Sequence, residues 1–183
     1  FLERIPPFPL DLSTTAQYLK ATKITFEEYT ERLLHNSKDL NSLLESILSE
    51  SGDHLKTRYN IISLSLKKII QTNQEVKDLL FFISLLDSQH IPRDLLDKYK
   101  GETLISKFIY HLKNFSLVST HTPNLMVPVS TLSLHSSTQE VSLNYLLDIL
   151  SSKEKSILLQ GLTSTLEAYV SNVLLQEDTS KAR

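Results

Sequence analysis

The chain contains 6 histidines and no cysteine. A histidine side chain can bind a metal or donate a hydrogen bond to an anion. The absence of cysteine excludes disulfides and thiolate chemistry, and it suits a reducing compartment. Five histidines lack metal-ligand spacing such as HExxH, so we interpret them as ordinary surface or boundary residues. They are His35, His54, His90, His111 and His121. The sixth, His135, ends an alternating apolar run just before an expected helix.

Catalytic machinery is not recognisable in the chain. No pair of carboxylates lies in an apolar frame suited to acid–base catalysis, and Glu27-Glu28 fit the first turn of a helix instead. Only 3 glycines occur in 183 residues, and neither GxxxxGK[ST] nor GxGxxG is present. We therefore predict no catalytic site, no metal site and no phosphate-binding loop of its own.

The bulk composition narrows the class of protein. Lys+Arg number 19 and Asp+Glu 21, so the basic surplus usual in nucleic-acid-binding proteins is missing. A hydrophobic content of 40% is enough for a core, yet no apolar run approaches the ~20 residues of a membrane span. No secretory signal is visible, so we expect a cytoplasmic protein without membrane contact. Because the chain begins with Phe1 rather than Met, we expect it to be a piece of a longer protein.

The elements that position His135 lie between residues 74 and 139. A dense apolar run at residues 76–86 predicts a helix buried on most sides. Helices are expected at residues 93–99 and 102–115, separated by Gly101, and period-two strands at residues 116–120 and 131–135 around Pro123-Asn124. The order helix, helix, helix, hairpin is typical of a winged helix.

Helices are also expected on both sides of this segment. Pro6, Pro7 and Pro9 force a turn, and Pro9 begins a helix whose first turn tolerates proline. Amphipathic helices at residues 40–48 and 55–70 follow, and further helices come after the hairpin. Four capping boxes mark helix starts, with the serine or threonine as N-cap. They are Thr25 with Glu28, Thr72 with Glu75, Ser136 with Gln139 and Ser151 with Glu154.

We therefore predict a mainly α fold: a helical bundle subdomain, then a winged helix with a small β-hairpin, then C-terminal helices. The expected boundaries are residues 1–72 for the lid-like bundle, 73–150 for the winged helix and 151–183 for a helix leading towards a repeat region. No linker separates the first two parts, so they should pack directly.

Two stretches carry motifs of a known family. The first is PFPLDLS at residues 7–13 with TFEEY at residues 25–29, and the second is residues 85–96 with TLSLH at residues 131–135. They resemble the G-L-P-L-A-L and S-F-E-E-Y helix starts, and the winged helix ending in hydrophobic-His-Asp, of the NB-ARC branch of STAND-class ATPases. The resemblance is strongest to bacterial members of the family that are joined to helical repeats. It covers about residues 5–145.

The resemblance implies two nucleotide contacts in the full-length protein. In the family, the motif proline lies near the adenine and the motif histidine contacts the terminal phosphate of ADP in the resting state. By position these are Pro9 and His135. Pro7 stands where the family has glycine, and Ser136 where it often has aspartate. Serine also caps a helix, so His135 would still lie beside a helix N-terminus that favours an anion.

The implied function is a non-catalytic regulatory arm that closes over ADP and keeps a signalling switch off. ATP or ADP would be held by the full-length protein rather than by this chain. The implied partners are an upstream nucleotide-binding domain and downstream helical repeats of the same chain, with self-assembly on activation.

Two other interpretations stay open. The chain could be a stand-alone helical scaffold that binds a partner protein. It could also bind DNA through the helix at residues 102–115, which has no arginine and charges only at Glu102, Lys107 and Lys113, with His111. Phosphate neutralisation supplies most DNA affinity, so this is disfavoured, and the apolar surplus of that helix suits protein packing better.

Overall fold

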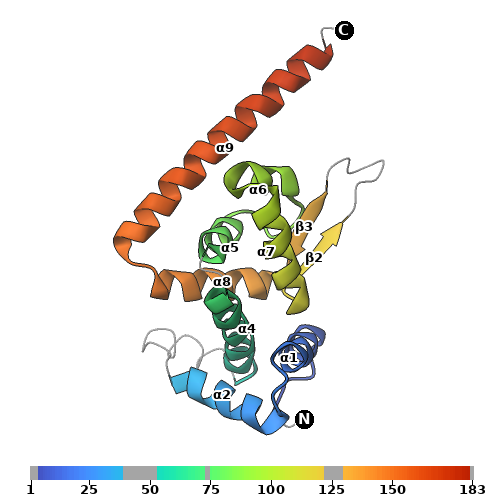
Figure 1. Ribbon diagram of the computed structural model, residues 1–183, viewed down its shortest axis with the longest axis vertical. Coiled ribbons are helices and arrows are strands. Elements are labelled where there is room, and N and C mark those ends of the chain that lie inside the picture. The colour runs from blue at the N-terminus through green and yellow to red at the C-terminus, as the bar shows by residue number, and fades with distance from the viewer. Residues whose placement is uncertain (1–3, 39–52, 73–74, 122–129, 182–183) are drawn as a thin grey trace.

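Helices dominate the protein, as the mainly α prediction requires, and a small antiparallel sheet lies at one side (Figure 1). The computed structural model describes residues 4–38, 53–72, 75–121 and 130–181. In the described part, no helix is long and apolar enough to cross a membrane.

The N-terminal helices form a bundle around one central helix. Helices α1 (Pro9–Thr22) and α2 (Phe26–Lys38) both pack on α4 (Asp53–Thr72). Pro9 occupies the first turn of α1, where its missing N–H has no helical partner to lose. The capping box of α2 is confirmed: Thr25 Oγ1 accepts from the Glu28 N–H at 3.2 Å, and Glu28 accepts from the Thr25 N–H at 3.3 Å.

The winged helix follows in the expected order. Helix α5 (Val76–Leu85) leads through β1 (Ile91–Pro92) to α6 (Arg93–Lys100) and α7 (Glu102–Asn114), and then to β2 (Val118–His121) and β3 (Thr131–Leu134). The strand order is β1-β3-β2, all antiparallel. Strand β1 was not predicted. It tolerates a proline because it lies at the edge of the sheet.

The apolar side of α7 faces the protein's own core. Ile105, Phe108 and Leu112 are buried, and Leu104 and Ile109 pack beside them. The apolar surplus of this helix is therefore used in packing within the protein. The exposed face of α7 carries polar residues and one large ring, with Lys107 beside Tyr110.

Two helices complete the fold. Helix α8 (Ser136–Ile149) packs against both α4 and α5, and α9 (Ser152–Lys181) packs against α5 and α6. The capping box before α9 is confirmed, because Glu154 accepts from the N–H and the hydroxyl of Ser151 at 2.9 and 2.7 Å. The distal part of α9 extends beyond the body of the protein (Figure 1).

Two predicted helix starts were wrong. Thr72 is the last residue of α4, and α5 begins after Glu75 without a side-chain cap. Ser136 is the first residue of α8, and His135 is its N-cap. The Gln139 amide reaches across to the Leu86 carbonyl oxygen rather than back to the cap.

Asn36 belongs to α2 and is buried. Arg4 and Ile5, which precede the prolines, lie in a turn and a bend. The helix expected at residues 40–48 and the breakers Pro123-Asn124 lie outside the described residues.

One hydrophobic core joins the bundle to the winged helix. It includes Ile62 and Leu66 of α4, Phe82 of α5, Phe108 of α7 and Leu146 of α8, all almost fully buried. Because α4 packs on α8, the bundle and the winged helix contact each other directly, and movement of one against the other would open this core.

Candidate functional site

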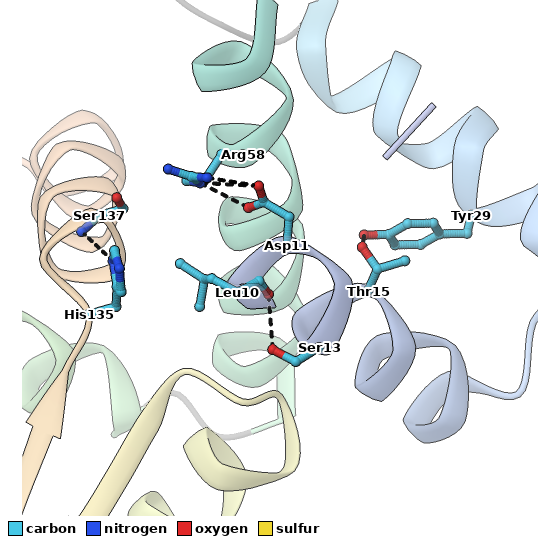
Figure 2. Close-up of polar contacts among 8 residues, drawn as sticks. All are labelled: Leu10, Asp11, Ser13, Thr15, Tyr29, Arg58, His135 and Ser137. Carbon is cyan, nitrogen blue, oxygen red and sulfur yellow. Dashed lines mark hydrogen bonds and ion pairs between the residues drawn. The ribbon is translucent and has the colours of Figure 1, made fainter. Parts of the chain in front are cut away.

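His135 lies between the end of β3 and the start of α8, on the surface of the protein. Its backbone is extended (φ −69°, ψ 140°), which is the usual conformation of an N-cap. Its Nδ1 accepts from the Ser137 N–H at 3.2 Å (Figure 2). The neutral ring therefore carries its proton on Nε2, which is the nitrogen able to donate to a ligand.

A cavity of about 420 Å³ opens beside this histidine. It lies between the C-terminal end of α7, strands β2 and β3, and the turn before β1. No acidic residue is among the described residues that line it. The polar lining residues are Gln89, Lys113, Ser116, Ser119, Ser133 and His135.

The wall of the cavity is held in place by bonds across the chain. Gln89 Nε2 donates to the Leu134 carbonyl at 2.9 Å, and the His90 N–H donates to Ser133 Oγ at 3.0 Å. The Leu134 N–H donates to the Ser88 carbonyl at 2.7 Å. These bonds fix the turn at residues 87–90 against β3, so that the cavity is preformed.

The positive side chain of the cavity is Lys113, in the last turn of α7. Its Nζ donates to Thr120 Oγ1 of β2 at 3.1 Å. This bond directs the lysine side chain towards the wing, which is the hairpin formed by β2 and β3. Lys113, the imidazole and the N-terminus of the 14-residue α8 all favour negative charge in this region. With hydroxyls on its walls and no carboxylate among the described lining residues, the site suits an anion.

Pro9 is exposed at the start of α1, after the N-cap residue Phe8. Next to it, Arg58 of α4 makes a two-pronged ion pair with Asp11, with N–O distances of 3.0 to 3.2 Å. The guanidinium also lies over the Phe8 ring, 4.8 Å from its centroid. Asp11 is completely buried, so this pair fixes the start of α1 on α4.

The two predicted contact residues lie on different elements. Figure 2 shows His135 and Ser137 set apart from the Asp11–Arg58 pair. Within the described residues, no recorded hydrogen bond or ion pair links α1 to His135. Pro9 is also not among the residues that line the cavity beside His135.

Lys113 and Gln89 were not predicted as site residues. They come within reach of His135 only through the fold, because 46 residues separate Gln89 from His135 along the chain. The single available signal was the lysine in the last turn of a helix that precedes a strand. For metals, no group of three His, Asp or Glu side chains that could hold an ion occurs in the described residues.

No protein-family model matches the chain. No curated protein matches its sequence either. The assignment to the NB-ARC branch therefore stays a prediction from the motifs.

Proposed function

We propose that this chain is the regulatory arm of a STAND-class nucleotide switch of the NB-ARC branch. It carries out no catalysis, and it closes over ADP held by an upstream nucleotide-binding domain of the same full-length protein. The observation that supports this best is His135, which offers a donor nitrogen at the edge of a preformed cavity that contains Lys113 and no described carboxylate.

The proposal assigns a contact to each part of the nucleotide. His135 Nε2–H donates to an oxygen of the terminal phosphate of ADP, and Lys113 adds positive charge. Pro9 and the 44% exposed Phe8 offer an apolar surface for the adenine. A γ-phosphate adds bulk and charge at the His135 contact, so ATP favours the open arm. Bistable elements of this kind are biased by a γ-phosphate in other switches.

The proposed partners of this chain are other parts of the same full-length protein. The open arm exposes the nucleotide-binding domain for self-assembly, and α9 leads into helical repeats of the same chain. The protein acts in the cytoplasm, where nucleotide is abundant. No membrane or nucleic acid takes part.

The test is the release of a fluorescent ADP analogue from the full-length protein. We expect His135→Ala to speed ADP release by about tenfold, since a hydrogen bond to a charged group contributes about 1.5–3 kcal/mol. Basal self-assembly should rise in the same variant. His121→Ala is the control, because His121 is exposed on the same wing but does not line the cavity. Unchanged release and assembly in His135→Ala would overturn the proposal.

A second candidate is a protein-binding scaffold without nucleotide. The observation that favours it is the distal part of α9, where Val170, Val173 and Leu174 are 52%, 37% and 57% exposed. The two candidates differ in one measurable property: full-length protein purified under native conditions carries bound ADP in the first case and none in the second.

A further inference from the structure

Two exposed histidines contact each other at the small sheet. His90 lies in the turn before β1, and His121 is the last residue of β2. Their ring centroids are 5.7 Å apart, and the ring planes are tilted by 41°. The two residues belong to different elements, so only the fold brings the imidazoles together. Imidazole nitrogens are common ligands of transition-metal ions, and the pair is therefore a candidate for metal binding.

Both histidines are held on β3, the central strand of the sheet. The His90 N–H donates to Ser133 Oγ of β3 at 3.0 Å. Its backbone has a φ of 55°, in the left-handed region, which histidine adopts more readily than most residues. His121 pairs with Thr131 in the register of β2 on β3. The separation of the two rings is therefore set by the sheet itself.

A hydroxyl beside the histidines has no bonding partner. Thr131 is 4% exposed, and its Oγ1 makes no hydrogen bond to any described residue. Side chains alternate along a strand, and Leu132 and Leu134 belong to the core, so Thr131 and its cross-strand partner His121 lie on the opposite face of the sheet. An unpaired buried hydroxyl lowers stability, and a bound group that donates a proton to it would remove that cost.

We propose that His90 and His121 bind one divalent transition-metal ion of the zinc type. Zinc–nitrogen bonds of about 2.0–2.1 Å in a tetrahedral site place two imidazole centroids roughly 5–6 Å apart, which matches the observed 5.7 Å. No third His, Asp or Glu among the described residues joins the pair, so water completes the coordination. A metal-bound water donates to Thr131 Oγ1. A simple ring contact would explain the distance between the imidazoles, but it leaves that hydroxyl unpaired.

The ion would connect the two outer segments of the sheet. The strand order is β1-β3-β2, so a bridge from His90 to His121 spans β3 and joins the turn before β1 to the end of β2. Neither histidine lines the cavity beside His135, so the metal site does not depend on the proposed nucleotide contact. A ligand that binds only the folded state stabilises it, and zinc should therefore slow amide hydrogen exchange in β2.

The experiment is a calorimetric titration of this chain with zinc chloride in metal-free buffer at neutral pH. We expect one ion per chain with micromolar affinity, and no binding of magnesium, which prefers oxygen ligands. His90→Asn and His121→Gln should each weaken zinc binding about tenfold or more, because each leaves a single imidazole. Asparagine tolerates a positive φ and His121 is exposed, so both variants should fold.

Thr131→Val tests the hydroxyl separately, because valine keeps the shape of the side chain. Zinc binding should weaken several-fold, while the metal-free variant is at least as stable as the unmodified chain, since it buries no unpaired oxygen. Unchanged zinc affinity in Thr131→Val would overturn the role given to the hydroxyl.

His35→Gln is the matched control, because His35 is an exposed histidine of α2 in the bundle. It should bind zinc like the unmodified chain, and in NMR spectra the imidazole signals of His90 and His121 should shift together. Absent binding, full affinity in both His90→Asn and His121→Gln, or equal weakening in His35→Gln would overturn the inference. ADP release is measured without added metal, where His121→Ala removes no metal contact, so either experiment can fail without the other.

Discussion

Asp11 is the buried charged residue on which the start of α1 depends. It is 0% exposed, while the side chain of Arg58 is 15% exposed. Burying an ion pair of this kind costs free energy. Removing only one of its partners costs far more, because the other charge is then buried without its counter-ion. The pair therefore determines how α1 sits on α4, and with it the position of Pro9.

Asp11→Asn should lower the free energy of unfolding by about 3 kcal/mol, at the low end for a buried pair because Arg58 keeps some solvent contact. Urea denaturation checks this. Glu102→Gln is the control, since its carboxylate is 82% exposed and 3.9 Å from Arg93, and should change stability by less than ~0.5 kcal/mol. An Asp11→Asn value as small as that of the control would show that the pair does not hold the helix.

At the scale of elements, the helices and strands that depend on neighbouring residues were predicted from the sequence. Features that depend on residues far apart in the chain were not. Pro9 located the start of α1, helical periodicity located α4 and α7, and period-two alternation located the hairpin, since these signals lie within a few residues of one another. The two-residue β1 was missed because its register depends on pairing with Thr131 and Leu132, about 40 residues later. Ser136 was predicted as a cap because it fits the capping pattern, yet the imidazole of His135 accepts the bond instead.

The candidate site shows the same division. The position of His135 at the end of a strand and before a helix was predictable from period-two alternation followed by a capping pattern. The cavity beside it was not, because Lys113 and Gln89 reach it through the packing of α7 and the turn at residues 87–90. The Asp11–Arg58 pair was missed for a similar reason, since the partners lie 47 residues apart.

Glu154 links the start of α9 to α5. Its pKa is lowered to about 2 from an ordinary value of 4.5, first by the hydrogen bond from Lys77 and then by those from Ser151. Because the folded-state pKa is the lower one, this contribution to stability is present above pH 4.5 and is lost as the pH falls towards 2. We expect Glu154→Gln to be less stable than the unmodified chain at pH 7, with the difference shrinking between pH 4.5 and 2.

The measurement is the urea midpoint of both chains as a function of pH. Glu102→Gln again serves as the matched control and should follow the unmodified chain throughout. A gap between the Glu154→Gln and unmodified curves that stays constant down to pH 2 would mean that the carboxylate is not the titrating group.

At the scale of the whole molecule, the contact between α4 and α8 decides whether the bundle and the winged helix behave as one body. Tyr59 of α4 lies in this contact, and its pKa is raised to about 12, by burial first and then by Asp148 and Tyr145 of α8. One core connects the bundle to the winged helix, so the two can move only as one unit.

Leu146 tests this directly, because it is fully buried in α8, the helix that touches both parts. Leu146→Ala should cost about 2–5 kcal/mol through the cavity it leaves. Hydrogen exchange should then accelerate to the same extent in the slowest amides of α1, α4 and α7, since these open only with global unfolding. Leu147→Ala, 41% exposed on the same helix, should change little. Faster exchange confined to residues 75–149 would instead mean that the bundle and the winged helix unfold separately.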